Sequence, residues 1–599
     1  MEIIKTFFGL LTPSERRKLY LLFVAVLVMA GMQVVSVASI MPFLSVAADP
    51  ASVQENAYLD WAFHAFGFQD SHSFLIALGV GALLLLVVSN ASIVVTNWAM
   101  YHYAWGRNHS LSHRLLESYL HYPYEYFLTH NGAELRKNIL EEVKEIVMGM
   151  IRPGLRGMAK AIMALFIVAF LVFMDPVVAL VVAIVLGSAY VGIYFTVRNR
   201  IDAYGTHRVE ENTRRYQFVS EALGGIKEVK LRGKEAVFLE QYDVPSEKYS
   251  WYQAQYRFIK GMPRYVLEAV AFGGIILIAV YLIAVQNSIR NVIPMLGLYA
   301  FAGYRLMPAL QQAFAAVANL QYNFAALEML HDNLQAHTKT RVAPQVSRNG
   351  ESKFHQLDDR LVLEDVHYTY PGADEPTISG LSLEIPARTT VGFVGKTGSG
   401  KTTTIDLILG LLRPQKGVIS VDGIPLSNGV LSDWQQDIGY VPQQIYLSDD
   451  TVARNIAFGV PREQIDMDAV RDASRRAHIH DFVVGELPNQ WSTTVGEQGV
   501  KLSGGQRQRI GIARALYHKP SVLVFDEATS ALDQATEASV MQAIYELEDD
   551  HTMLMIAHRL STVQRADNIV MLEQGRKVGE GSYEELSDTN DKFQQMVFS

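Results

Sequence analysis

The longest stretch of the chain without a positive charge runs from Leu19 to Gly106, where no Lys or Arg occurs. It contains two apolar runs, at about residues 19–47 and 73–100. Each run exceeds the roughly 20 residues that a helix needs to cross the hydrocarbon core of a bilayer. The first run is also too long for the apolar part of a signal peptide, so both are expected to be uncleaved membrane spans.

Four further apolar runs bring the number of candidate spans to six, and they lie at about residues 157–174, 177–197, 265–286 and 292–320. A water-soluble fold would have to bury six runs of this length, so we expect an all-α membrane domain over residues 1–332. Lys and Arg of this part concentrate at the N-terminus and in the segments 107–156 and 198–264. Because positive residues stay on the cytoplasmic side, these parts are expected there.

The two basic segments contain few helix-breaking residues, which predicts helices that extend beyond the bilayer. Short interruptions at residues 121–127 and 224–230 are the expected turning points of two helical hairpins. After the last span, residues 333–358 are polar and unpatterned, and we interpret them as a linker. Residues 359–599 then form a second domain.

Charge and composition exclude two classes of chemistry. From residue 341 onward the chain carries 24 Lys and Arg against 36 Asp and Glu, which argues against a nucleic-acid-binding surface. The chain has no cysteine, which excludes disulfides, thiolate catalysis and cysteine-ligated metals.

The second domain contains a phosphate-binding loop. A β-branched run at 389–394 predicts a strand, G-K-T-G-S-G-K-T follows at 395–402, and a helical pattern comes next. This is the G-x-x-x-x-G-K-[ST] motif between a strand and a helix, where backbone N–H groups and the helix N-terminus face phosphate oxygens. Lys401 should reach the β- and γ-phosphates of ATP, and Thr402 should supply an oxygen to Mg²⁺.

A second predicted strand, S-V-L-V-F-D-E at 521–527, ends in two acids. Asp526 suits the Mg²⁺ shell, and Glu527 is placed to polarise the attacking water. The alternative is a pair of solvated acids at a strand end, which the phosphate loop makes a poor interpretation.

Between these two motifs lies K-L-S-G-G-Q-R-Q at 501–508. Its L-S-G-G-Q resembles the signature of ATP-binding-cassette (ABC) ATPases, in which Ser503 and two glycines open a helix whose N-terminus can hold a γ-phosphate. The resemblance extends over the whole chain. It implies a six-helix transmembrane domain of the ABC exporter type (type IV), followed by an α/β P-loop ABC ATPase domain.

The resemblance also implies roles for single residues. Tyr370 resembles the aromatic residue that stacks on adenine, Gln443 the glutamine that senses Mg²⁺, and His558 the switch histidine at the γ-phosphate. S-A-L-D at 530–533 resembles the dimer-contact loop, and T-V-G-E-Q-G at 494–499 the exporter coupling loop, which usually has Arg where Gln498 stands. The expected site comprises the catalytic residues Lys401, Glu527 and His558, the Mg²⁺ ligands Thr402, Gln443 and Asp526, and the ATP-binding residues Tyr370, Gly395, Lys396, Thr397, Gly398, Ser399, Gly400, Lys401, Thr402, Thr403, Gln443, Ser503, Gly504, Gly505, Gln506 and Asp526.

The chain carries one phosphate loop and one signature segment. In ABC proteins ATP is held between the phosphate loop of one cassette and the signature of another. The resemblance therefore implies a half-transporter that works as a homodimer with two ATP sites and twelve spans.

A single positive charge, Arg305, stands between Asn291 and Thr338. An arginine inside a bilayer faces a cavity or a partner far more often than lipid. Together with Arg264 and Glu268 it forms the expected substrate site, where arginine would bind a phosphate or pyrophosphate.

Two alternatives remain for the other charges near the spans. Arg264 has Glu268 one helical turn away and can pair with it. Arg152, Arg156 and Lys160 can extend along their helix to the inner membrane interface.

Short stretches of the membrane half resemble PglK-type flippases, which turn lipid-linked oligosaccharides across the bacterial inner membrane. They are A-S-I-M-P-F-L-S-V-A-A-D-P at 38–50, G-M-P-R-Y-V-L-E at 261–268 and A-G-Y-R-L-M-P-A at 302–309. This resemblance implies an ATP-driven flippase of a polyprenyl-pyrophosphate glycan in that membrane, with the N-terminus and the ATPase domain in the cytoplasm and with membrane lipids around it.

Other functions remain open at this point. An exporter of lipid A, a drug or a peptide has the same sequence pattern. A non-transport ABC ATPase or an ATP-gated channel belongs to another class. The six expected spans argue against a soluble ATPase, and the presence of Glu527 favours ATP turnover over gating.

Overall fold

The structure of the chain is a computed structural model. It describes residues 2–174, 176–285, 289–339, 356–427, 429–496, 499–528, 533–557 and 559–597. The chain divides into two compact units. The helical unit contains Met1–Tyr122 and His130–Arg341, and the α/β unit contains Pro123–Thr129 and Val342–Ser599.

The described part of the helical unit contains helices and no strand. Its helices are α1 (Glu2–Leu10), α2 (Pro13–Ala38), α3 (Ile40–Ala48), α4 (Ser52–Glu55), α5 (Ala57–Ala65), α6 (Ser71–Leu120), α8 (Gly132–Lys137), α9 (Val143–Ile146), α10 (Arg152–Met174), α11 (Pro176–Gly224), α12 (Ile226–Arg232), α13 (Glu235–Val285), α14 (Ile289–Tyr322) and α15 (Phe324–Lys339). Two π-helical turns, η1 (Asn138–Glu142) and η2 (Val147–Ile151), stand on either side of α9.

Three helical stretches of the described residues are long and apolar enough to cross a membrane, namely Pro13–Ala48, Ser71–Leu120 and Gly132–Met174. They contain the first three expected spans. The other three expected spans fall in α11, α13 and α14, where many side chains lie outside the described residues.

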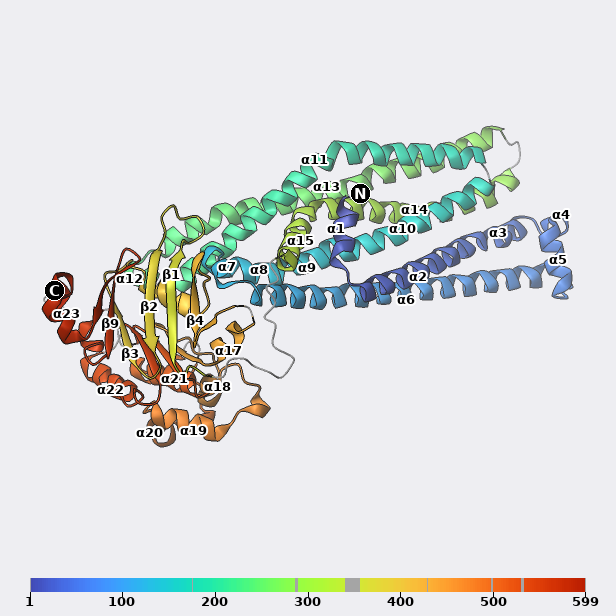
Figure 1. Ribbon diagram of the computed structural model, residues 1–599. Coiled ribbons are helices and arrows are strands. Elements are labelled where there is room, and N and C mark those ends of the chain that lie inside the picture. The colour runs from blue at the N-terminus through green and yellow to red at the C-terminus, as the bar shows by residue number, and fades with distance from the viewer. Residues whose placement is uncertain are drawn as a thin grey trace. The chain divides into compact units, whose positions relative to one another are not determined.

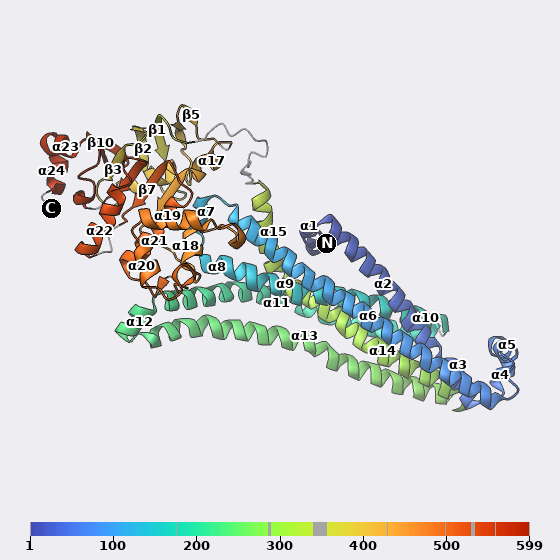
Figure 2. The same ribbon diagram turned by 90° about the horizontal axis from the view of Figure 1, so that it is seen from below.

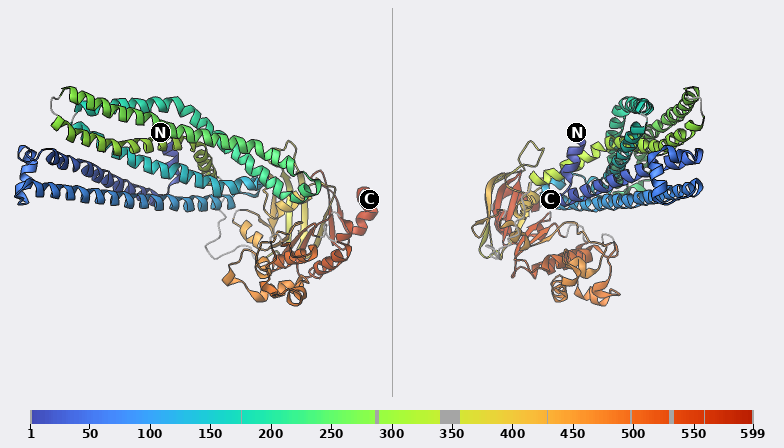
Figure 3. Two further views of the ribbon diagram at one scale, coloured as in Figure 1. Left: turned by 180° about the vertical axis from the view of Figure 1, so that it is seen from behind. Right: turned by 90° about the vertical axis from the view of Figure 1, so that its right-hand side faces the viewer.

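Local signals explain where the first long helix begins. Thr12 caps α2 through a reciprocal pair of hydrogen bonds with Glu15, and Pro13 occupies the first helical position. Figures 1 and 2 show α2 beside α6, and α14 beside α10 and α13. The short helices α4 and α5 follow α3 at the end of the unit where α6 begins, in blue in Figure 3.

Small residues let the helices α10 and α14 approach closely. A Cβ built on Gly157 of α10 would lie 2.0 Å from the Cβ of Ala316 in α14. Ala302 and Ala309 of α14 are fully buried in the same interface, beside Ile167. Such small residues are typical of helix contacts in membranes, because packing rather than water exclusion holds the helices together.

The chain turns at both expected points of the helical hairpins. The helix α6 ends at Leu120, before α7, and α11 ends at Gly224, before α12. Residues 333–339 of the expected linker are helical, because α15 continues to Lys339. Leu327 and Leu330 are buried on one side of α15. The polar residues that follow them continue the same helix. Residues 340–355 of the expected linker lie outside the described residues.

The α/β unit contains two sheets. The smaller sheet has the order β2 (Ile378–Pro386), β1 (Arg360–Tyr368), β4 (Lys416–Val421) and β5 (Ile424–Pro425), and its strands are antiparallel. The larger sheet has the order β10 (Arg576–Gly581), β9 (Asn568–Glu573), β3 (Thr390–Val394), β8 (Thr552–Ile556), β7 (Val522–Asp526) and β6 (Ile438–Val441). All its neighbouring strands are parallel except β10, which pairs antiparallel with β9.

Helices surround these sheets (Figure 1). They are α7 (Tyr124–Thr129), α16 (Lys401–Ile408), α17 (Leu431–Gln436), α18 (Val452–Ile456), α19 (Met467–Arg476), α20 (His480–Gly485), α21 (Gly504–Leu516), α22 (Gln534–Tyr545), α23 (Tyr583–Thr589) and α24 (Asp591–Val597), with short helical turns η3 (Arg462–Gln464), η4 (Gln490–Ser492) and η6 (Leu560–Thr562). Strand β3 is buried along its whole length, as a central parallel strand covered on both faces must be. The phosphate loop follows this strand.

Candidate functional site

The phosphate loop joins β3 to α16, as the strand–loop–helix pattern predicts. Its first residue, Gly395, has φ +147°, and a Cβ there would lie 2.3 Å from the carbonyl oxygen of Leu572. Only glycine fits this position, because the loop passes directly against a neighbouring backbone. Gly400 caps α16 with φ +101°, which turns the loop into the helix.

Lys401 is the first residue of α16 and is 5% exposed. Its Nζ donates to the carbonyl oxygens of Gly395, at 2.8 Å, and Lys396, at 3.1 Å. Burial lowers the pKa of Lys401, whereas the carboxylates of Glu527 and Asp526 act to raise it. The ammonium group is thus held inside the loop by carbonyl dipoles, in the position where a phosphate would supply the opposite charge.

The two threonines after Lys401 have different surroundings. Thr402 is exposed, so its hydroxyl is open to a metal ion. Thr403 is buried, and its Oγ1 lies 3.2 Å from the hydroxyl of Tyr370. The side chain of Thr403 therefore contacts the expected adenine-stacking residue.

The acids expected at the end of the second strand lie at the carboxyl end of β7. The hydroxyl of Tyr440 donates to Oδ2 of Asp526 at 3.3 Å. Nε2 of Gln443 donates to Oε2 of Glu527 at 2.6 Å, so the expected metal sensor and the expected base are in direct contact. Glu527 has φ +48°, a sparsely populated conformation for a non-glycine residue that is typical of functional positions.

These groups suit a magnesium nucleotide. Mg²⁺ prefers oxygen ligands, and Thr402, Gln443 and Asp526 can offer a hydroxyl, an amide oxygen and a carboxylate. The Nε2 atom of Gln443 is engaged with Glu527, which leaves the amide oxygen for a metal. When bound, Mg²⁺ would neutralise part of the negative charge of the phosphates.

The signature segment begins α21. Ser503 caps this helix: its Oγ accepts from the backbone N–H of Gln506 at 3.2 Å, and its own N–H donates to Oε1 of Gln506 at 2.8 Å. Gly505 allows close packing, since a Cβ there would lie 2.3 Å from Cγ2 of Thr536. Ser503 is exposed, so the N-terminus of this helix is open at the surface of the unit.

Some expected residues lie outside the described part of the chain. They are His558, residues 530–532 of the dimer-contact loop, and Glu497 and Gln498 of the coupling loop. Asp533 is described, and it caps α22 by accepting from the backbone N–H of Thr536.

Sequence reasoning missed Asp406, which lies in α16 one turn after the phosphate loop and is 9% exposed. Burial, with a smaller contribution from Asp526, raises the pKa of Asp406 to about 6. The sequence offered one signal for this residue: it is an acid at an inward-facing position of the helix predicted after the phosphate loop. When ionised, this acid adds to the negative potential at Asp526.

A second missed group links α7 to the adenine side of the site. The hydroxyl of Tyr368 donates to Oε1 of Glu125 in α7 at 2.8 Å. The ring of Tyr368 meets that of Tyr370 edge to face, with centroids 5.1 Å apart. Glu125, Tyr368, Tyr370 and Thr403 therefore form a continuous chain of contacts within the α/β unit, which no local motif indicates.

In the helical unit, Arg305 donates a hydrogen bond to Oε1 of Gln33 in α2. Gln33 is fully buried, and its Nε2 donates to Oγ of Ser89 in α6 at 2.6 Å. Among the described residues Arg305 has no carboxylate partner. The arginine is thus held by the amide of Gln33, which is itself anchored by the hydroxyl of Ser89, and its charge is left uncompensated.

The other expected substrate residues are placed differently. Nε of Arg264 lies 3.4 Å from Oε1 of Glu268, in an exposed pair one helical turn apart. Arg152 and Arg156 both donate to the hydroxyl of Tyr101 in α6, at 2.7 and 3.3 Å. The pairing of Arg264 with Glu268, left open by the sequence, is present in the structure.

A phosphate loop with an acidic strand end, in a chain that also carries bilayer-length helices, defines a membrane-associated nucleotide hydrolase. Two family profiles match the chain: "ABC transporter" at residues 378–530 and "ABC transporter transmembrane region" at residues 18–304. The ATP-dependent lipid A-core flippase of Cupriavidus metallidurans is 33% identical over 483 residues, which cover 80% of this chain and 79% of the relative. That of Francisella novicida is 43% identical over 243 residues, which cover 41% of this chain and 40% of the relative.

A solved structure, titled "Structure of a bacterial Atm1-family ABC exporter with ATP bound", matches with TM-score 0.78 at 21% identity and covers 97% of each chain. The chain belongs to the ABC transporter family, as an exporter half-transporter with a transmembrane helical domain followed by an α/β ATPase domain. Its activity is ATP hydrolysis coupled to transport across a membrane.

Proposed function

We propose that this half-transporter moves a phosphorylated glycolipid from the inner to the outer leaflet of a bacterial inner membrane. The first candidate is a lipid A-type molecule, since relatives at about 30% identity over most of the chain are lipid A-core flippases. The observation that carries the anionic character of the cargo is Arg305, which is bonded to Gln33 and has no carboxylate partner among the described residues. A phosphate group would compensate this charge.

A second candidate is a polyprenyl-pyrophosphate-linked glycan. It is favoured by the short stretches around Arg264 and Arg305 that resemble PglK-type flippases. Outward movement of either anion across an inside-negative membrane is favoured by about 2.3 kcal/mol per charge per 100 mV. The two candidates share the phosphate and differ in the lipid that carries it.

For ATP hydrolysis we assign the residues as follows. Lys401 would bind the β- and γ-phosphates, and Tyr370 would stack on adenine. Thr402, Asp526 and the amide oxygen of Gln443 would hold Mg²⁺. Glu527 accepts a proton from the attacking water, and its contact with Gln443 orients the carboxylate. His558 contacts the γ-phosphate.

We also propose a homodimer. The chain has one phosphate loop and one signature helix, and Ser503 at the exposed N-terminus of α21 would face the γ-phosphate bound by the partner. Closure of the two ATPase domains on ATP, and their release after hydrolysis, would drive the change in the membrane domain.

The test is a flipping assay in proteoliposomes, with a lipid A-type glycolipid and a polyprenyl-pyrophosphate glycan as separate cargoes. We expect ATP-dependent flipping of the first cargo at a higher rate than the second, and none with Glu527→Gln. That variant should bind ATP normally and hydrolyse it 10²–10⁴-fold more slowly. Flipping of only the second cargo would reverse the order of the candidates, and flipping of neither would contradict the proposal.

A further inference from the structure

A cavity of about 420 Å³ lies between α13 and α14 in the helical unit. Arg257, Lys260 and Arg264 line it from α13, and Gln311, Gln312 and Phe314 line it from α14. Its volume is in the range of sites that bind small molecules or headgroups. The polar atoms that line it come from three cations and two amides.

The cavity carries a positive charge that the protein leaves uncompensated. Arg257, Lys260 and Arg264 follow one another at spacings of three and four residues, so they share one face of α13. No acid lines the cavity, and neither Arg257 nor Lys260 pairs with a carboxylate anywhere in the described part of the chain. The pair of Arg264 with Glu268 is exposed, and such pairs contribute little.

Lys260 is held in place from the opposite helix. Its Nζ donates to Oδ1 of Asn319 at 3.1 Å, and the same oxygen accepts from the hydroxyl of Tyr256. Asn319 is 5% exposed, so this anchor is fixed. An ammonium group has three N–H donors, and Asn319 takes one, which leaves two for a ligand.

Burial and the like charge of Arg257 lower the pKa of Lys260. An anion in the cavity would offset both effects, because it supplies hydrogen-bond acceptors and the opposite charge together. An anionic ligand would therefore stabilise the charged form of Lys260 more than that of an ordinary surface lysine.

The depth of the cavity matches a lipid headgroup. Arg257 and Lys260 lie within about two helical turns before the expected start of span 5 at residue 265, on its cytoplasmic side. Gln311 and Gln312 lie in the cytoplasmic half of the expected span 6. Phe314 and Pro263 add apolar surface next to the charges. This lining would accept a headgroup whose phosphate lies beside the cations and whose carbon chains or sugar faces lie beside Phe314.

We propose that this cavity binds the phosphate of a lipid headgroup at the inner-leaflet boundary, as the first binding station of the transported lipid. This inference rests on the proposed function. It adds Arg257, Lys260 and the two glutamines to the substrate path, separate from the Arg305–Gln33–Ser89 group between α14, α2 and α6.

The experiment uses the full-length protein in nanodiscs of zwitterionic phosphatidylcholine. Diphosphorylated lipid A and its dephosphorylated form are titrated separately, and bound lipid is counted by native mass spectrometry while ATPase stimulation is recorded in parallel. We expect Lys260→Gln, and Arg257→Gln with Lys260→Gln, to raise the half-saturating concentration of the phosphorylated lipid at least tenfold. Lys260→Arg should restore binding.

Arg200→Gln is the matched control. Arg200 is exposed on α11 just beyond the expected span 4, and its substitution removes the same charge. Equal binding by wild type and Lys260→Gln would overturn the inference, and so would an equal loss in Arg200→Gln. Displacement of the lipid by millimolar inorganic phosphate or pyrophosphate would overturn the lipid assignment and indicate a site for free anions. Lipid binding that depends on Lys260 without any flipping would contradict the proposed function but support the cavity as a lipid site.

Discussion

Two buried lysines, in different units of the molecule, differ in the groups that surround their charge. Lys137 in the helical unit is 1% exposed, donates to Oγ1 of Thr213 at 2.6 Å and lies 3.7 Å from Oε1 of Glu142. Lys401 in the α/β unit is 5% exposed and donates only to carbonyl oxygens of its loop, among the hydrogen bonds described for it. The first charge is balanced by the protein, whereas the second awaits the charge of a ligand.

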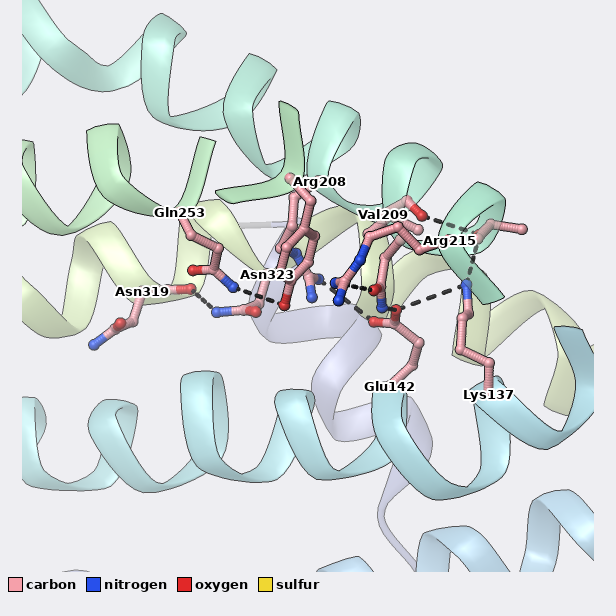
Figure 4. Close-up of polar contacts among 11 residues, drawn as sticks. Lys137, Glu142, Arg208, Val209, Arg215, Gln253, Asn319 and Asn323 are labelled. Atoms are coloured by element: carbon pink, nitrogen blue, oxygen red, sulfur yellow. Dashed lines mark hydrogen bonds and ion pairs between the residues drawn. The ribbon is translucent and has the colours of Figure 1, made fainter. Parts of the chain in front are cut away.

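The surroundings of Glu142 show which groups balance the first charge (Figure 4). Oε2 of Glu142 lies 3.4 Å from Nη2 of Arg208, which is fully buried, and Oε1 accepts from Asn212 at 3.4 Å. One carboxylate of η1 thus joins two cations, from α8 and α11. Buried cations that share a carboxylate hold elements together, and buried cations without a carboxylate mark sites for an anion.

The largest expected effect is on stability and concerns the balanced lysine. Glu142→Ala leaves Lys137 and Arg208 buried without their carboxylate, which costs about 3–5 kcal/mol. We expect a large drop in the apparent melting temperature of the purified protein in detergent. Glu240→Ala removes an exposed acid from α13 and is the control, so an equal drop in both variants would contradict the structural role of Glu142.

The comparison extends to a buried acid, Asp406, which has no cation partner in the described residues. Because its pKa is raised to about 6 from an ordinary 3.8, the folded state binds the proton more tightly than the unfolded state. Stability is therefore lost as pH rises from about 4 through 6, by up to about 3 kcal/mol. Asp406→Asn should raise the melting temperature at pH 8 in nucleotide-free, magnesium-free buffer, with a gain that shrinks towards pH 5. An increase in melting temperature that does not depend on pH would contradict the raised pKa of Asp406 as its cause.

Lys401→Ala should leave the fold intact and weaken ATP binding. The variant removes hydrogen bonds from a charged donor to phosphate, worth about 1.5–3 kcal/mol, so the dissociation constant should rise by roughly 10–150-fold. Titration with a fluorescent ATP analogue measures this, and a melting curve without nucleotide serves as the control. A large loss of stability without nucleotide would place Lys401 in the same class as Lys137.

The smallest effect is expected at Tyr368. Tyr368→Phe keeps the ring against Tyr370 and removes the hydrogen bond to Glu125, which is worth about 0.5–1.5 kcal/mol. Hydrogen exchange of the amides of α7 should accelerate by about 2- to 12-fold. Tyr446→Phe, on an exposed tyrosine of the same unit, should leave α7 unchanged. Unchanged protection in Tyr368→Phe would show that the hydroxyl does not hold α7.

The parts that were predictable from sequence are those in which the functional residues are neighbours along the chain. Gly395 to Thr402 are contiguous, and Asp526 and Glu527 end one strand, so their places follow from local patterns. The apolar runs likewise predicted the first three bilayer-length helices.

The parts that were not predictable depend on contacts between distant segments. Gln33 is 272 residues from Arg305, and Glu125 is 243 residues from Tyr368, so no spacing rule connects either pair. The π-helical turns η1 and η2 also left no signal in the sequence. The cavity at Lys260 could be located only when α14 brought Asn319 to α13.

The placement of α7 has a practical consequence for dissecting the molecule. This short helix precedes the rest of its unit by more than 200 residues, yet it packs there and accepts the hydroxyl of Tyr368. A fragment cut at the apparent domain border near residue 342 would therefore be missing a piece of its own surface, beside the aromatic pair that leads to Thr403. Biochemists who express that fragment alone should supply residues 123–129 as a fused or added peptide before comparing its turnover with that of the intact transporter.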